Sequence, residues 1–376
     1  MMNKNFLAVS GSHSEMGFRQ GAEFAADIKG TFKRVLGFDG IKLVKPFFMP
    51  KSVFGWFMKR EIAAKWLGNI RVMAPHQYER LLGIAEGADT PMEELLSIQA
   101  LEVMADDVSL VIEGCFSAAL HPSRTVSGEP AVIKNFDFIR DFADDNIARI
   151  SSPKTGFASF ELTYKQITGS HDGMNEKGLV ITYNYGLTAE KTEARLPITL
   201  LVQEILENCA TVEQALALVG NFRFPNAAIL TVADVSGAAA SVEITPEHIA
   251  VRRPANGVIV NTNFFSTDEI KKFDIPRSAM YSKKAPAGIR GRRIHETNEL
   301  RYDRAMELIN SNKKLSEDDL IKILSDHSGA VGSEDTICRH GDFFRTQVSA
   351  IFYPRRRRIL VSFGFPCLSE FSEYIF

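Results

Sequence analysis

The sequence predicts an α+β chain in which two stacked β-sheets carry helices on their outer faces, a four-layer αββα sandwich preceded by a mainly helical N-terminal segment. Three observations support this prediction. Residues 1–113 contain helix-starting signals and apolar residues at helical spacing, strand-like runs begin abruptly at Gly114, and pairs of helices then interrupt those runs. Blocks of antiparallel strands separated by helix pairs are typical of stacked sheets with helices outside.

Composition places the chain among ordinary globular proteins. Of its 376 residues, 45% are hydrophobic and 24% are charged, and the net charge of −2 argues against nucleic acid as the main partner. No apolar run approaches the roughly 18 residues of a membrane span, and the N-terminal apolar run is too short for a signal peptide. We therefore expect a cytoplasmic protein with no integral membrane segment, while a homo-oligomer is left open.

Helix-starting signals organise the N-terminal segment. Ser12 and Glu15 have the spacing of a capping box, which predicts a helix through about residue 36. Residues 90–93 (Thr-Pro-Met-Glu) form a second such signal, followed by apolar rows that include Leu95, Ile98 and Leu101. Between them, residues 46–56 are rich in Phe, Met and Trp. We expect core there, although an exposed part could contact an oily substrate or lipid.

Strands and helices alternate after Gly114. The strand-like runs are 115–120, 131–138, 158–164, 179–184, 227–235, 239–244, 258–263, 348–353 and 359–363. The predicted helices are 197–208, one capped by Thr211, 300–310, and one capped by Ser316. Residues 264–296 contain prolines and glycines and are predicted to be a long mobile loop.

A hairpin brings a thiol and a carboxylate toward each other. Cys115 starts one strand, and turn-forming residues between 122 and 129 predict a turn near residue 126. The returning strand would then place Asp137 beside Cys115, with Asn135 and Asp137 on one face. The spacing alone slightly favours another interpretation, a buried cysteine near an edge carboxylate.

Two other strands end in asparagine, a residue that is disfavoured in strand interiors. Asn184 and Asn263 could aim amide N–H groups at a reacting carbonyl and form an oxyanion hole. Ordinary strand-terminating turns would explain them as well. Arg301 and Arg304, near the start of a helix, are also compatible with a solvated face.

An ordered set of motifs carries a resemblance to a known family. Glu-Gly-Cys115-Phe-Ser and Lys-Asn-Phe-Asp137-Phe resemble the N-terminal-nucleophile hydrolases of the acyl-coenzyme A:isopenicillin N acyltransferase type. More distantly, they are similar to the choloylglycine hydrolases and penicillin V acylases. The other matching segments are 11–21, 83–88, 172–179 with Asn184, 261–264 and 300–304.

The resemblance implies a residue-by-residue assignment of the site. Cys115 matches the nucleophile, released as a new N-terminus by cleavage between Gly114 and Cys115. Asp137 matches the carboxylate near the new amine, Asn184 and Asn263 match oxyanion-hole positions, and Arg301 matches the site arginine. Residues 1–114 would be the helical prosegment and 115–376 the αββα catalytic domain. Lys134 is a departure, because it stands where the bile-salt enzymes have arginine.

The implied activity is acyl transfer through an acyl-Cys115 intermediate. The expected substrates are linear amides or thioesters of acylated small molecules, with water or an amine as acceptor. No cofactor is expected, apart from the possibility of an acyl-coenzyme A co-substrate. Two alternatives remain: an uncleaved hydrolase that pairs Cys115 with His121 or His171, and a non-catalytic binding protein on the same scaffold.

Cysteine spacing predicts neither disulfides nor a metal. Cys115, Cys209, Cys338 and Cys367 are widely separated, which suits a reducing compartment. Cys338 and His340 resemble half of a metal site, but no neighbouring segment completes it at the spacing of a zinc finger. We therefore expect no metal.

Overall fold

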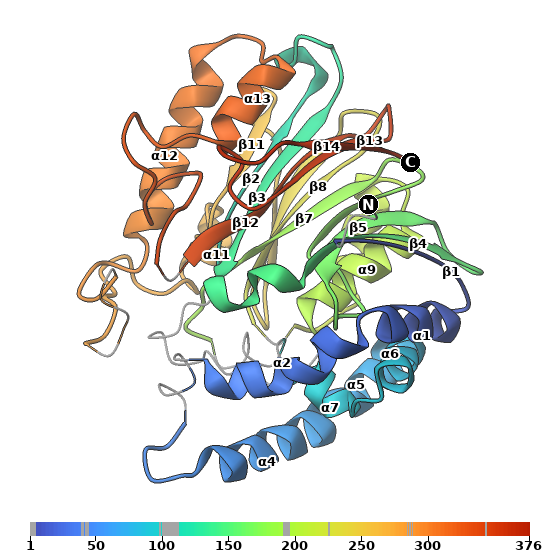
Figure 1. Ribbon diagram of the computed structural model, residues 1–376. Coiled ribbons are helices and arrows are strands. Elements are labelled where there is room, and N and C mark those ends of the chain that lie inside the picture. The colour runs from blue at the N-terminus through green and yellow to red at the C-terminus, as the bar shows by residue number, and fades with distance from the viewer. Residues whose placement is uncertain are drawn as a thin grey trace.

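Two β-sheets stacked face to face form the centre of the molecule (Figure 1). The computed structural model describes residues 5–38, 41, 45–97, 99, 113–190, 196–224, 226–283, 285, 287, 289–342 and 344–376. Helices cover the outer face of each sheet, and the N-terminal helices lie below them in the view of Figure 1. The predicted αββα architecture is confirmed.

The larger sheet has eight strands, of which the first comes from the N-terminal segment. Their order is β1 (Phe6–Gly11), β4 (Asn146–Pro153), β5 (Ser159–Tyr164), β6 (Asp172–Asn175), β7 (Val180–Tyr185), β8 (Ala228–Ala233), β9 (Ala239–Ile244) and β10 (Ile249–Arg252). Strand β1 pairs in parallel with β4, whereas every other pair in this sheet is antiparallel.

The smaller sheet has six strands, all paired antiparallel. Their order is β11 (Val258–Asn261), β2 (Glu113–Leu120), β3 (Ala131–Ile139), β12 (Phe344–Tyr353), β13 (Arg358–Phe363) and β14 (Ser372–Ile375). Strands β2 and β3 form the predicted hairpin, with a short helical turn η2 (Pro122–Arg124) at its closed end.

The helices divide into three groups. The N-terminal group is α1 (His13–Glu23), α2 (Ala25–Gly37), α4 (Lys51–Ile62), η1 (Ala63–Leu67), α5 (Gly68–Met73), α6 (Pro75–Ala88) and α7 (Met92–Leu95). Helices α9 (Ile198–Asn208) and α10 (Val212–Val219) pack on the larger sheet. Helices α12 (Glu296–Ser311) and α13 (Glu317–Leu324) pack on the smaller one, while α11 (Asp268–Lys271) and η3 (Arg140–Asp145) lie in connections.

Glycines let the helices α1 and α6 approach until their backbones touch. A Cβ atom on Gly17 would lie 2.1 Å from Arg80 O, and one on Gly83 would lie 2.2 Å from Ser14 O. These glycines belong to the two N-terminal segments that carry the family resemblance, so those segments form one helix–helix contact. The Ser12–Glu15 capping box is present, but the helix breaks at Phe24 into α1 and α2.

Two sequence predictions about local structure are wrong. Thr90 does not cap a helix, because its hydroxyl donates to Ala88 O (3.2 Å) and α7 begins after Pro91 without a side-chain cap. Ile98 and Leu101 lie outside the described residues. The described part of the segment 264–296 contains helix α11 and is packed, since Phe265, Ile270 and Tyr281 are buried.

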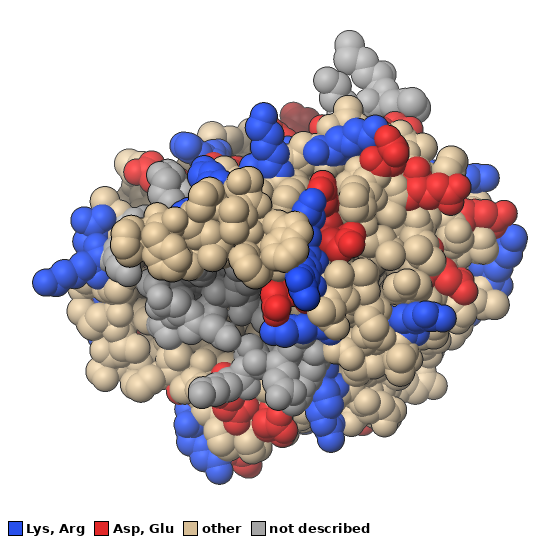
Figure 2. All heavy atoms as spheres, turned by 90° about the horizontal axis from the view of Figure 1, so that it is seen from below, with Lys and Arg blue, Asp and Glu red and all other residues tan. Residues whose placement is uncertain are grey.

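The aromatic segment near α4 is divided between core and surface. Phe54 and Met58 are buried, whereas Phe47 is 96% exposed and Trp56 is 52% exposed. Figure 2 shows the face to which this segment contributes, where uncharged side chains form a broad surface beside charged ones. Among the described residues, no helix combines the length and apolar character needed to cross a membrane.

Candidate active site

Cys115 is the third residue of strand β2 and is wholly buried. In the hairpin, Cys115 is opposite Phe136, and Gly114 is opposite Asp137. Side chains of opposite residues share a face and successive residues alternate. The Cys115 side chain therefore enters the core between the sheets, whereas the Asp137 carboxylate points toward α12 on the other face. The predicted thiol–carboxylate pairing was wrong by one residue of register.

On the side of strand β2 that faces β11, the backbone of Cys115 is held by side chains instead of by a paired strand. Strand β11 ends with Asn261 opposite Ser117, so the ladder stops before it reaches Cys115. The Cys115 N–H donates to Asn263 Oδ1 (2.8 Å), and the Cys115 carbonyl accepts from Arg301 Nη1 (2.8 Å). The two predicted residues Asn263 and Arg301 thus take the place that a paired strand would fill.

Arg301 organises one side of this site. Its Nη2 donates both to Asn263 Oδ1 (3.0 Å) and to Asn298 Oδ1 (2.7 Å). The Asn263 Oδ1 atom therefore accepts hydrogen bonds from both Cys115 and Arg301, which fixes the orientation of the side-chain amide. Its Nδ2 points away from these two residues and donates to Tyr185 O (2.9 Å). Complete burial lowers the pKa of Arg301 to about 10, with the charge of Arg339 adding to the effect.

Arg339 is a site residue that sequence reasoning missed. An ideal Cβ on Gly114 would lie 1.8 Å from Arg339 Nη1, so the guanidinium lies directly against the Gly114 backbone. Gly114 has no positive φ, and glycine is required there for space and not for backbone strain. Arg339 Nη2 also donates to Glu334 Oε2 (2.8 Å).

Asp137 is the counter-charge shared by the two arginines. Its Oδ2 lies 3.8 Å from Arg301 Nη1 and 4.0 Å from Arg339 Nη1, while Oδ1 accepts from the Thr346 hydroxyl (2.7 Å). Burial raises the pKa of Asp137 to about 6, although both guanidinium groups act in the opposite direction. The carboxylate is therefore ionised at neutral pH and gains a proton in mild acid.

Asn184 belongs to a neighbouring network. Its Oδ1 accepts from Lys134 Nζ (2.8 Å) and Ser117 Oγ (3.1 Å). Its Nδ2 donates to the carbonyls of Asn261 (3.2 Å) and Thr262 (3.0 Å), which uses both amide hydrogens. Asn184 therefore anchors the chain that carries Asn263, and its amide has no hydrogen left for an oxyanion unless one of these bonds opens. Arg304 bonds to Asp326 and takes no part in the site.

The two histidines considered for catalysis lie in different places. His121 is at the closed end of the hairpin, six residues of extended strand from Cys115, or roughly 20 Å. His171 stacks on Phe136, the residue opposite Cys115, with ring centroids 3.9 Å apart, and its Nδ1 is 2.7 Å from Asp172 Oδ2. Burial lowers the pKa of His171, so the ring is neutral at pH 7.

A two-sheet sandwich with a cysteine near the start of a central strand, bordered by asparagine and arginine side chains, agrees with the class of amidases and acyltransferases that the sequence resembles. The family model for acyl-coenzyme A:6-aminopenicillanic acid acyl-transferase matches residues 124–366. The chain therefore belongs to this family, as the resemblance predicted, and is an enzyme that acts on carbon–nitrogen bonds other than peptide bonds. The matched region includes Asp137, Asn184, Asn263 and Arg301 and begins after Cys115.

Solved structures include three similar proteins. An N-acylethanolamine-hydrolyzing acid amidase ortholog from Caenorhabditis elegans shares 14% identity, with a TM-score of 0.44 over 64% of this chain and 93% of that one. A variant of the conjugated bile acid hydrolase from Clostridium perfringens shares 14% (TM-score 0.42, 69% and 97%). The penicillin V acylase from Agrobacterium tumefaciens shares 15% (TM-score 0.42, 66% and 82%). No curated protein sequence matches the chain significantly.

Proposed function

We propose that the chain is a self-processing cysteine amidohydrolase or acyltransferase that cuts itself between Gly114 and Cys115 and then uses the freed Cys115 as nucleophile. The observation that best supports this proposal is the hydrogen bonding of the Cys115 backbone by the side chains of Asn263 and Arg301. A side chain that accepts from the amide N–H before cleavage is already placed to accept from the amine that cleavage creates.

The first stage is an acyl shift within the precursor. The Cys115 thiol attacks the Gly114 carbonyl carbon, the C–N bond breaks, and the thiol proton ends on the Cys115 nitrogen. Water then opens the thioester, leaving a Gly114 carboxylate and a free thiol. Arg339 lies against Gly114, so its positive charge is close to the peptide unit whose carbonyl oxygen becomes negative during the attack.

The second stage uses the new amine as base. An α-amino group has an ordinary pKa of about 8, so an uncharged fraction exists at neutral pH to take the thiol proton. Arg301 bonds to the same Asn263 oxygen as the Cys115 nitrogen, and its charge disfavours the ammonium form. Asp137 balances the two arginines from the opposite face of the strand.

Asn263 also offers the oxyanion donor. Its Nδ2 carries two hydrogens, and the bond to Tyr185 O uses one of them. The other is available for the oxyanion of an amide or thioester substrate during attack by Cys115. We assign Asn184 the positioning of residues 261–262.

The proposed substrate is an acylated small molecule with a linear amide or thioester bond, and the acyl group passes from Cys115 to water or an amine. Membership of an acyl-coenzyme A-dependent transferase family supports acyl-coenzyme A as a co-substrate. Under this proposal, residues 1–114 are the prosegment and residues 115–376 the catalytic domain.

Intact mass after purification tests the self-processing. We expect two associated fragments, 1–114 and 115–376, from the parent chain and from Cys209→Ala, a control that alters another buried cysteine. Cys115→Ala should remain a single chain. Cutting of Cys115→Ala at the same bond, or a parent chain that stays whole under folding conditions while hydrolysing amides, would contradict the proposal.

A Cys115–His171 hydrolase is the second candidate. It is favoured by the Asp172–His171 pair and by His171 Nε2, which is buried without a hydrogen-bond partner among the described residues. A chain translated from an uncleaved methionine placed before Cys115 distinguishes the two. Activity in that blocked enzyme, together with loss of activity in His171→Ala, would favour the Cys–His mechanism.

A further inference from the structure

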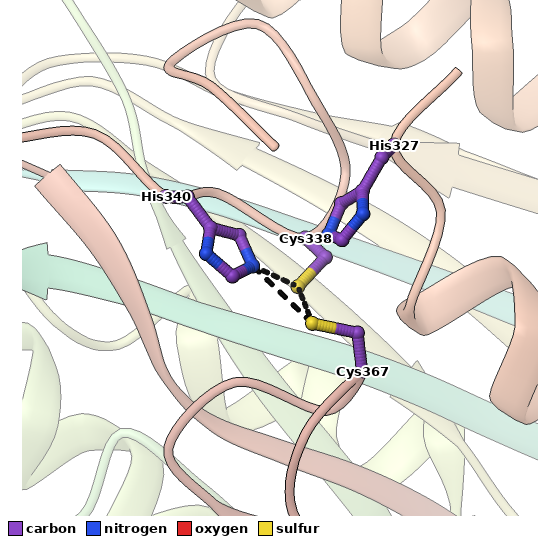
Figure 3. Close-up of side chains that lie close together, drawn as sticks. All are labelled: His327, Cys338, His340 and Cys367. Carbon is purple, nitrogen blue, oxygen red and sulfur yellow. Dashed lines mark hydrogen bonds between the residues drawn. The ribbon is translucent and has the colours of Figure 1, made fainter. Parts of the chain in front are cut away.

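Four side chains of the metal-binding type converge at one point beside the smaller sheet (Figure 3). His327 follows α13, Cys338 and His340 precede β12, and Cys367 follows β13. One ligand atom from each residue lies within 4.8 Å of all the others. The sequence showed only the Cys338–His340 half of this cluster, because the remaining two residues come from separate loops.

The separations within the cluster suit a tetrahedral metal ion. Cys338 Sγ lies 3.3 Å from His340 Nε2 and 3.6 Å from Cys367 Sγ, and His340 Nε2 lies 3.3 Å from Cys367 Sγ. Zinc binds sulfur at about 2.3 Å and nitrogen at about 2.0–2.1 Å, which gives ligand–ligand separations of roughly 3.3–3.8 Å in a tetrahedron. Three of the four atoms already have this geometry.

The surroundings hold the histidine rings in place. His340 stacks on Phe365, with centroids 3.9 Å apart and an interplanar angle of 13°. A Cβ on Gly332 would lie 2.3 Å from His340 Cδ2 and 3.1 Å from His327 Cδ2, so both rings pack against a position with no side chain. A fixed ring orientation is what a metal site requires of its ligands.

His327 supplies an independent indication of a missing partner. Its Nε2 is buried and has no hydrogen-bond partner among the described residues. Leaving a buried polar nitrogen without a partner is unfavourable. A metal ion bound at the centre of the cluster would satisfy this nitrogen.

We propose that His327, Cys338, His340 and Cys367 bind one zinc ion. Two thiolates and two imidazoles in a tetrahedron select zinc among the common divalent ions. All four positions would be filled by the protein, which leaves no open site for substrate, so the ion is structural. On binding, both thiols lose their protons to solvent and zinc gains two sulfur and two nitrogen bonds.

The proposed zinc ligands flank a residue of the candidate active site in the sequence. Arg339 stands between the ligands Cys338 and His340, and its guanidinium packs against Gly114. Zinc would join the loops after α13 and β13 to the segment that carries Arg339. It would thereby hold this arginine in position, and the metal site does not depend on the proposed catalytic mechanism.

Metal analysis of the full chain tests the proposal. The protein is purified without an affinity tag or chelator, under reducing conditions, and its zinc content is measured per chain. We expect about one zinc in the parent and in the controls Cys209→Ala and Cys115→Ala, and at least a ten-fold lower content in Cys367→Ala and His327→Ala. Chelation should lower the thermal midpoint of the parent but leave that of Cys367→Ala unchanged.

Cobalt substitution provides a measurement that needs no variant. After removal of zinc, Co²⁺ added to the parent should give the intense visible bands of a tetrahedral site and the thiolate charge-transfer band. A parent chain that binds neither zinc nor cobalt would overturn the proposal, as would full zinc content in Cys367→Ala. An intact mass lighter by two hydrogens, with Cys338 and Cys367 joined as a disulfide under reducing purification, would also overturn it.

Discussion

Gly114→Ala is the most direct test of the arrangement around the proposed scissile bond. The added methyl would lie 1.8 Å from Arg339 Nη1, whereas ordinary contact begins near 3.4 Å. Either the guanidinium or strand β2 must therefore move by more than an ångström. Both groups are enclosed, since Arg339 is buried and β2 lies between two other strands.

The expected cost follows from what this movement disturbs. Overfilling a packed interior costs about 1–3 kcal/mol, and breaking a buried ion pair costs about 3–5 kcal/mol. Moving Arg339 would lengthen its 4.0 Å approach to Asp137 and strain the 2.8 Å bond to Glu334 without removing either partner. We therefore expect Gly114→Ala to lower the free energy of unfolding by about 2–4 kcal/mol.

Denaturant unfolding in a Cys115→Ala background measures this cost on a single uncut chain. Gly30→Ala is the control, because a Cβ there meets nothing within 4 Å and alanine in helix α2 should stabilise by up to about 1 kcal/mol. Arg339→Ala completes a double-mutant cycle. In that background, Gly114→Ala should cost less than about 0.5 kcal/mol.

Two results would refute the reasoning. One is a change for Gly114→Ala no larger than that for Gly30→Ala. The other is an equal cost of Gly114→Ala with and without Arg339, since a steric conflict with the guanidinium must disappear when the guanidinium is removed.

Three further predictions concern the same site. Asn263→Asp keeps the acceptor for the Cys115 N–H, so the two fragments should still form. Turnover should fall at least ten-fold, because the amide N–H donor of Asn263 is lost. An equal loss of fragment yield and of turnover would contradict this prediction. The pKa of Asp137, raised from 3.8 to about 6, means that the folded chain binds this proton more tightly than the unfolded chain. The free energy of unfolding should therefore fall by up to about 3 kcal/mol as pH rises from about 4 to about 6, and Asp137→Asn should remove this slope in pH-dependent denaturation. His171→Ala should reduce turnover less than ten-fold at pH 7 in a steady-state assay, since the proposed mechanism uses the α-amine as base.

Local signals predicted several of the helices and most central strands. The Ser12 and Ser316 capping boxes and the Thr211 cap are present as expected, because such signals need only neighbouring residues. Strand β4 was missed because it carries Arg149, fully buried in a strand interior and paired with Glu161 of β5. That partner is supplied by the fold and is not visible in a local pattern.

The sequence predicted that Asp137, Asn263 and Arg301 lie near Cys115, but it did not predict how they are arranged. The turn of the β2–β3 hairpin is centred half a residue before the predicted position, so Asp137 lies opposite Gly114 and not opposite Cys115. This shift of one residue in register places the Asp137 carboxylate on the other face of the sheet from the Cys115 thiol. Arg339 and the ligand Cys367 were missed for a different reason. Arg339 meets Gly114 and Asp137, and Cys367 meets Cys338 and His340, across more than twenty residues of chain. The pairing of β12 with both β3 and β13 brings these segments together.

Because β1 pairs in parallel with β4, the proposed cleavage would change the kinetic order of refolding. Strand β1 precedes Gly114 and β4 follows it, so one hydrogen-bonded ladder would join two separate polypeptides after cleavage. The precursor folds in a first-order reaction because both strands belong to one chain. Once cut, the same assembly is a heterodimer whose reassembly from denaturant is second order, so its recovery depends on protein concentration. Cleavage would therefore preserve the native contacts while removing the unimolecular route back to them.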